Sequence, residues 1–169
     1  MRMIRELTSD KDIDLVANLA RVIWHEYFRK LISIDQIDYM LDKFQSSSAI
    51  KQAIEFDNYK YFGIYNDDEL AGYIGIQIRI NDAYLSKFYL NKKYRGLGLG
   101  KELMDKAISY ALENDVLALT LNCNKYNEDS LEIYKHLGFK IKASTVNEIG
   151  EGFVMDDYIL SKNLELINK

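Results

Sequence analysis

The chain has 169 residues, 48% of them hydrophobic, which suits one domain with a continuous core. Its 22 basic and 26 acidic residues leave a formal charge of -4, so it lacks the cationic field that holds a nucleic-acid backbone. A single cysteine, Cys123, excludes an internal disulfide and a cysteine-rich metal cluster. No stretch approaches the roughly 20 apolar residues of a membrane span, and the first residues lack signal-peptide features. We therefore expect one domain over 1–169, a cytoplasmic location, and no metal, nucleic-acid or membrane partner; a homodimer is compatible with the sequence.

The first third of the chain is expected to be a short strand followed by helices. Met3, Ile4 and Leu7 mark a short strand-like stretch, and residues 9–12 are typical of a helix N-cap. Apolar side chains then recur at helical spacing over 13–27. A second helical pattern runs from Ser33 or Asp35 to Phe44, and serines 46–48 cap a shorter helix that ends near Phe56.

Strand patterns dominate from residue 59 onward. The expected elements are a hairpin of 61–65 and 70–78, a strand over 83–90, a helix after the glycine cluster, a buried strand over 116–121, a helix over 127–137, and strands near 140–146 and 153–160. This order predicts the class α/β (α+β): a mixed, mostly antiparallel central sheet of about seven strands flanked by helices.

A glycine-rich loop, residues 95–101, lies between a predicted strand and an amphipathic helix. Its sequence is Arg95-Gly96-Leu97-Gly98-Leu99-Gly100-Lys101. Backbone N–H groups of such a loop converge with the helix N-terminus on one anion, and glycine lets the backbone approach it. The P-loop pattern fails because Arg95 stands where its first glycine belongs, and the Rossmann pattern fails because Lys101 replaces its last glycine. A phosphate cradle is favoured over a simple tight turn.

Two signatures together resemble the GNAT acetyltransferase family. Residues 94–100 are similar to the family's motif A, Gln/Arg-x-x-Gly-x-Gly/Ala, with Arg95, Gly98 and Gly100 in its fixed positions. Residues 127–139 resemble its second signature, Asn-x-x-Ala/Ser-x-x-x-Tyr-x-x-x-Gly-Phe. The likeness covers about residues 60–160 and implies a GNAT-like fold, an N-acetyltransferase activity and acetyl-CoA as cofactor.

The resemblance also implies a cofactor site. It implies that the strand segment 88–90 pairs through its backbone with the pantetheine arm of the cofactor. The loop that follows this segment would bind the pyrophosphate. The cofactor-binding residues it implies are Phe88, Tyr89, Leu90, Arg95, Gly96, Leu97, Gly98, Leu99, Gly100 and Lys101, with Asn127 on the pantetheine amides and Lys135 near the phosphates. Asn127 is equally suited to capping its helix, and both lysines to solvated helix positions.

Acetyl transfer needs a neutral amine, a polarised carbonyl and a proton for the leaving thiolate. The resemblance implies that Tyr134 donates this proton, and a phenol is protonated at neutral pH. Many relatives take the general base from a strand glutamate, but residues 83–89 carry no carboxylate. Asp82, Glu26 and a water chain through Tyr84 are left as alternatives.

The acceptor is expected to be a primary amine on a cationic molecule such as a polyamine, attacked directly in a ternary complex. The helical region 12–56 carries aromatic and acidic residues, both of which attract ammonium groups: Trp24, His25, Glu26, Tyr27, Asp35, Asp38, Tyr39 and Asp42. Residues 152–158 resemble the tail of some bacterial polyamine acetyltransferases, which places Asp156 or Asp157 near the acceptor. The alternatives are acetylation of a protein lysine or N-terminal amine, a non-catalytic acyl-CoA-binding module and a nucleotide-binding domain.

Overall fold

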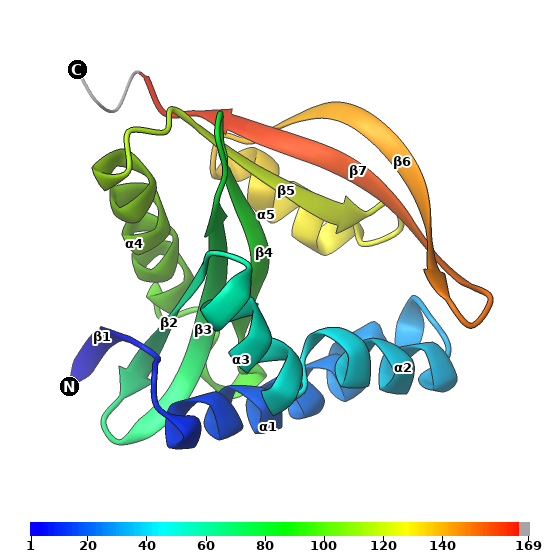
Figure 1. Ribbon diagram of the computed structural model, residues 1–169, viewed down its shortest axis with the longest axis horizontal. Helices are drawn as coiled ribbons and strands as arrows, with labels where there is room; N and C mark the ends of the chain where they lie inside the picture. Colours follow the sequence, from blue (N-terminus) through cyan, green and yellow to red (C-terminus); the bar gives the residue numbers. More distant parts are fainter. Residues whose placement is uncertain (166–169) are drawn as a thin grey trace.

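The fold is a seven-stranded sheet with helices on both faces, seen in a computed structural model that describes residues 1–165 (Figure 1). The strand order is β1-β2-β3-β4-β5-β7-β6, and all neighbours are antiparallel except β4 and β5. The strands are β1 (Arg2–Glu6), β2 (Tyr59–Asn66), β3 (Glu69–Ile78), β4 (Ala83–Leu90), β5 (Ala118–Asn124), β6 (Lys140–Gly150) and β7 (Phe153–Asn163). The α-helices are α1 (Asp10–Tyr27), α2 (Ile34–Phe44), α3 (Ser47–Phe56), α4 (Leu99–Glu113) and α5 (Glu128–His136), with single 3-10 turns at Phe28–Lys30 and Lys92–Tyr94.

The three N-terminal helices begin at serines that cap them. The Ser9 hydroxyl accepts from the backbone N–H of Asp12 at 3.1 Å, and the Asp12 carboxylate faces the backbone N–H of Ser9, which together form a capping box. The Ser33 and Ser46 hydroxyls cap α2 and α3 by accepting from the backbone N–H groups of Gln36 and Ala49, each at 3.1 Å. These contacts confirm the predicted starts of the helices.

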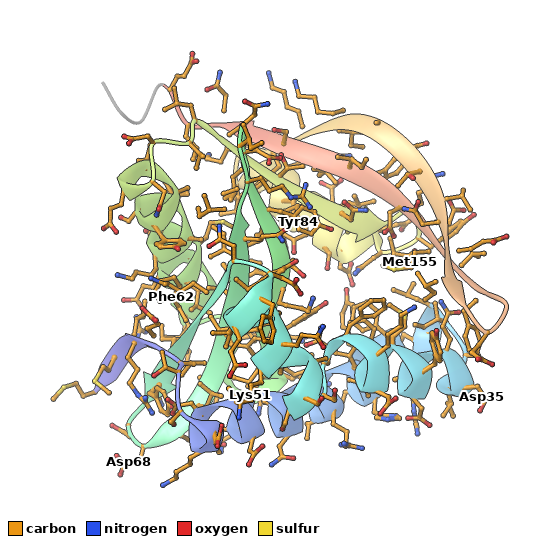
Figure 2. The ribbon with its side chains drawn as sticks, in the orientation of Figure 1. Asp35, Lys51, Phe62, Asp68, Tyr84 and Met155 are labelled. Atoms are coloured by element: carbon orange, nitrogen blue, oxygen red, sulfur yellow. The ribbon has the colours of Figure 1, made fainter. Side chains whose placement is uncertain are left out.

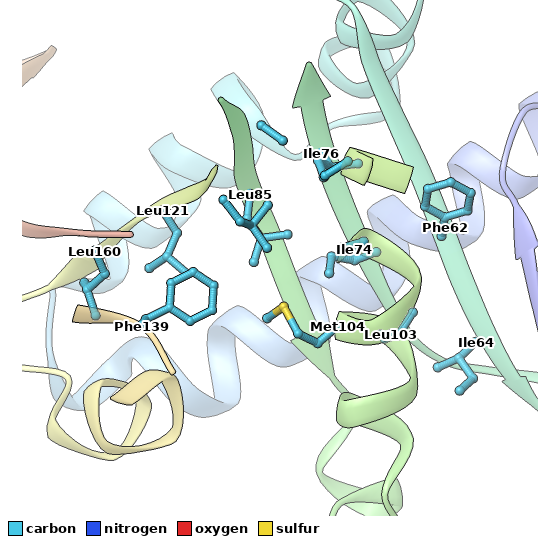
Figure 3. Close-up of a cluster of buried hydrophobic side chains, with 14 of the residues drawn as sticks. Phe62, Ile64, Ile74, Ile76, Leu85, Leu103, Met104, Leu121, Phe139 and Leu160 are labelled. Carbon is cyan, nitrogen blue, oxygen red and sulfur yellow. The ribbon is translucent and has the colours of Figure 1, made fainter. Parts of the chain in front are cut away.

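Each face of the sheet has its own hydrophobic core. One cluster joins the sheet to α4 and α5, and Figure 3 shows its centre, where Leu103 and Met104 of α4 meet Ile74 and Leu85. The other cluster joins the opposite face to α1, α2 and α3, and it includes Trp24 and Tyr73. A fully buried aliphatic or aromatic side chain contributes about 1.5–3 kcal/mol, so two such clusters hold the helices firmly on the sheet.

The sheet splits between its two parallel strands. β4 and β5 share only two register pairs, Ala83 with Leu119 and Tyr84 with Thr120. Beyond these pairs the register of β4 against β3 shifts at Ser86, and β4 and β5 diverge toward α1 and α2 (Figure 1). A bulge of this kind bends a strand away from its neighbour. The edges of both strands are therefore left open next to the cavity described below.

Three strands extend three or more residues past their expected C-terminal ends. β5 begins at Ala118 and continues to Asn124, and both β6 and β7 reach eleven residues. The apolar run that marked β5 stops at Leu121, but pairing with β7 carries the strand on through Asn122, Cys123 and Asn124. The extension matters because it brings polar side chains into the split.

Candidate active site

A cavity of about 360 Å³ occupies the split between β4 and β5. Most of its wall is apolar, and the polar groups are few. The lining comes from α1 and the following turn (Ile23, Trp24, Tyr27, Phe28, Ile32), α2 (Gln36, Met40), β4 and the glycine loop (Phe88, Tyr89, Leu90, Arg95, Gly100), β5 (Asn122, Cys123, Asn124), α5 with its cap (Asn127, Asp129, Ser130, Ile133, Tyr134) and β7 (Val154, Met155, Asp157). Apolar pockets with a few convergent polar groups are typical of small-molecule sites.

The cavity passes through the sheet. Tyr134 and Ser130 reach it from α5, on the face that also carries α4. Trp24 and Met40 reach it from α1 and α2, on the opposite face. Figure 2 shows Met155 on β7 between the sheet and α2. Two molecules that enter from opposite faces would therefore meet within the split.

The glycine loop opens α4 with unoccupied donors. Gly96 and Gly98 have φ of 81° and 80°, in the left-handed region that favours glycine, and Gly98 is the N-cap of α4 without a side-chain cap. A Cβ at either position would meet no atom within 4 Å, so backbone conformation, not space, requires glycine there. The first N–H groups of α4 are thus left for an anion at the positive end of the helix.

In the loop region, Lys101 and Arg95 have other partners within the protein, whereas Leu97 and Leu99 differ in how far their side chains are exposed. The Leu99 side chain is fully buried, so only its backbone is available to a ligand. Lys101 pairs with Asp105 at 3.0 Å, and the Arg95 guanidinium lies 5.5 Å from the centre of the Tyr27 ring. Leu97 is half-exposed on the surface.

Tyr134 projects from α5 into the cavity with its ring fixed by two aromatic neighbours. The ring centre is 5.7 Å from that of Phe139 and 6.2 Å from that of Phe88. Burial raises the pKa of the phenol well above its ordinary value, and the proximity of Cys123 and Tyr27 adds to the effect. The hydroxyl is therefore protonated across the physiological pH range and can act as a hydrogen-bond donor or an acid.

Asn127 ties α1 to α5 at the edge of the cavity. Its side-chain oxygen accepts from the Ser130 backbone N–H at 3.2 Å, which caps α5, and from the Tyr27 hydroxyl at 2.7 Å. The side chain is buried and lines the cavity with Arg95. Lys135 instead lies on the exposed side of α5, 3.7 Å from Glu132.

Comparison with known proteins agrees with this geometry. The model of the acetyltransferase (GNAT) family matches residues 20–139. The chain belongs to the GNAT family. It is an N-acetyltransferase of this type, and the family uses acetyl-CoA.

The relatives act on different amines. Spermidine N(1)-acetyltransferase of Thermoplasma acidophilum is 24% identical over 90% of this chain and 94% of its own. Peptidyl-lysine N-acetyltransferase YjaB of Escherichia coli is 31% identical over 44% of this chain, and this chain spans about half the length of that protein. The crystal structure of PaiA N-acetyltransferase from Thermoplasma acidophilum in complex with coenzyme A superposes with a TM-score of 0.80 at 23% identity, covering 96% and 99% of the two chains.

The three residues considered as routes to a general base, Asp82, Glu26 and Tyr84, are all absent from the lining of the cavity in this GNAT enzyme. Glu26 is exposed and lines an adjoining polar hollow with Lys30 and Lys92. Tyr84 lies at the closed end of the split (Figure 2), where the Arg79 guanidinium stacks 4.1 Å from its ring centre, and burial raises its pKa to about 12. Neither side chain is among the residues that line the cavity.

Sequence reasoning gave too little weight to the polar residues of β5 and β7. Asn122 lines the cavity from β5, and Asp157 lines it from β7 with only 2% of its surface exposed. The one available signal was the short tail likeness around Asp156 and Asp157, which did not separate the two. Among residues 1–165, no group of three or more histidine, cysteine, aspartate or glutamate side chains is placed to hold a metal ion. Nor is any helix in this part of the chain long and apolar enough to cross a membrane.

Proposed function

We propose that this GNAT enzyme transfers the acetyl group of acetyl-CoA to a primary amine of a small cationic molecule of the polyamine class. The observation that carries the proposal is the cavity in the split of the sheet, whose lining comes from the elements on both faces and leaves room for two substrates to meet. This arrangement favours direct attack in a ternary complex, because both molecules can be held at once.

The residues around the split suit acetyl-CoA. The free N–H groups at the start of α4 and the guanidinium of Arg95 would hold the pyrophosphate. The open edge of β4 at Phe88–Leu90 and the Asn127 side chain would bind the pantetheine amides. The indole N–H of Trp24 is buried without a partner among the described residues, so an acceptor atom of a bound molecule would satisfy it. When bound, acetyl-CoA supplies an activated acyl carbon.

Tyr134 is positioned to serve as the acid of the reaction. Its hydroxyl is on the α5 face of the cavity, where the thiol end of a molecule lying along β4 would arrive. The raised pKa keeps the proton on the phenol until a thiolate forms beside it.

The cationic acceptor is supported by the relatives and by the acceptor side of the cavity. A relative aligned over nearly the whole chain is a spermidine acetyltransferase. On the α1 and α2 face the cavity combines aromatic walls, Trp24 and Phe28, with the buried carboxyl of Asp157. Aromatic faces and carboxylates both attract ammonium groups.

An acceptor panel tests the proposal. Thiol release from acetyl-CoA would be followed with spermidine, a lysine peptide, an aminoglycoside and an anionic amino acid, and we expect spermidine to have the highest kcat/KM. A higher value for the lysine peptide would assign the enzyme to protein acetylation. Acetylation of the anionic amino acid alone would refute the cationic site. Tight cofactor binding by calorimetry, without release for any amine, would instead indicate a non-catalytic acyl-CoA-binding module.

A further inference from the structure

Asp157 is a buried carboxyl on the side of the cavity that faces α1 and α2. Side chains alternate along β7, so Met155 and Asp157 face α1 and α2, whereas Asp156 faces the α5 side. The other carboxyl of the cavity wall, Asp129, is exposed. Asp157 is thus the desolvated carboxyl on the wall of the cavity.

Asp157 has a hydrogen-bond partner but no cation. The Asn122 amide donates to its carboxylate at 3.4 Å. The nearby lysine, Lys125, is paired with Asp156 at 2.6 Å. Among the described residues no salt bridge involves Asp157, so the negative charge of its carboxylate lacks the compensation that a buried charge requires. A substrate ammonium would supply it.

The groups around Asp157 keep its carboxyl more basic than an ordinary one. Burial raises its pKa, Asn122 and Lys125 lower it, and Asp156 raises it. β4 presents the phenols Tyr84 and Tyr89, β5 presents the Cys123 thiol and α5 presents Tyr134. The lining from α1 and α2 includes no acid or base other than the phenol of Tyr27.

We propose that Asp157 binds the acceptor ammonium and is the general base of the acetyl transfer, opposite Tyr134 across the split. This inference rests on the proposed function. It assigns the base to β7, where the carboxyl reaches the cavity from the face opposite α5, so that a base and an acid flank the meeting point of the two substrates.

The proton balance of the step is complete with these two residues. Asp157 takes one proton from the ammonium, and the freed lone pair forms the C–N bond as the thioester C–S bond breaks. Tyr134 gives its proton to the departing sulfur. The second proton of the nitrogen returns to the Tyr134 oxygen through water, and Asp157 releases its proton to solvent. The products are the N-acetylamine, the CoA thiol and one proton.

The test compares Asp157→Asn with Asp156→Asn. Both variants remove one carboxylate from adjacent positions, but only the first alters the cavity. At pH 7 with spermidine, Asp157→Asn should lower kcat/KM by about 10²-fold or more, the usual range for a positioned base. The kcat/KM of Asp157→Asn should then rise about tenfold per pH unit as free amine accumulates, whereas the kcat/KM of the wild type should not change with pH over the same range. Asp156→Asn should keep the wild-type profile, and acetyl-CoA affinity should be unchanged in both.

A stability measurement separates this role from a structural one. Because a buried unpaired charge is removed, Asp157→Asn should melt at or above the wild-type temperature at pH 7. Turnover of Asp157→Asn at the wild-type level would overturn the inference while leaving the proposed function intact. A loss with a flat pH profile, or one accompanied by a lower melting temperature, would also overturn it. A wild type that acetylates no amine would refute both proposals.

Discussion

Replacing Tyr134 with phenylalanine removes a single hydroxyl from the cavity. The ring contacts with Phe88 and Phe139 are kept, and the hydroxyl has no hydrogen-bond partner among residues 1–165. We therefore expect the free energy of unfolding to change by no more than about 0.5 kcal/mol. Loss of a positioned acid, in contrast, should lower kcat by about 10²- to 10⁴-fold, which corresponds to roughly 2.7–5.4 kcal/mol of transition-state stabilisation.

The assay is steady-state thiol release at saturating acetyl-CoA and spermidine, with calorimetry of cofactor binding and a thermal melt on the same samples. Tyr110→Phe is the matched control, because Tyr110 packs on Phe62 at 5.6 Å, away from the cavity. Cofactor affinity should be similar in both variants. Wild-type turnover of Tyr134→Phe, or a loss matched by Tyr110→Phe, would show that the phenol only packs.

Three further predictions concern the loop, the first helix and the cysteine. Gly98→Val forces a left-handed φ on a branched residue, which should cost about 1–2 kcal/mol of stability, but it should weaken acetyl-CoA binding about tenfold or more in calorimetry because the N–H groups of α4 turn away. Asp12→Ala removes a capping box and the Arg5 contacts at 2.8 and 3.0 Å, so chemical unfolding should show a loss of about 1–3 kcal/mol. Burial alone would raise the pKa of Asp12, but the hydrogen bonds from Arg5 and Ser9 hold that pKa below its ordinary value. The contribution of the Asp12 carboxylate to stability is therefore present at neutral pH and is lost as the pH falls through the folded-state pKa. Cys123 should resist alkylation in the native protein at pH 8, because burial raises its pKa to about 12, and labelling at the rate of a free thiol would contradict this.

The order of strands and helices was predictable because local patterns determined it. Serines at positions 9, 33 and 46 precede helical periodicity, and the structure has a helix start at each. The mixed sheet and its seven strands are confirmed. The extent of β5 was harder to predict, because Asn122 and Asn124 are polar and only pairing with β7 makes them strand residues.

The site was less predictable than the fold. The motif positions Arg95, Asn127 and Tyr134 do converge on one cavity, although their roles stay predictions until they are tested. Glu26 lies beside aromatic residues in the sequence, but the turn of α1 directs its side chain to the exposed side. Whether the Asp157 side chain reaches the cavity depends on which face of β7 points into the split. That face is determined by the pairing of β7 with β5 and β6, which no local sequence pattern predicts.

The short contact between β4 and β5 also affects how the protein behaves as a folding unit. With only two register pairs, the backbone ladder does little to couple the two limbs of the sheet beside the cavity. A ligand bound to both open edges would act as a bridging strand, so amide hydrogens at Phe88–Leu90 should exchange far more slowly in its presence. At a ligand concentration 100 times Kd, the linkage adds about 2.7 kcal/mol to global stability. The enzyme would thus unfold more cooperatively in cells rich in its cofactor than in those depleted of it.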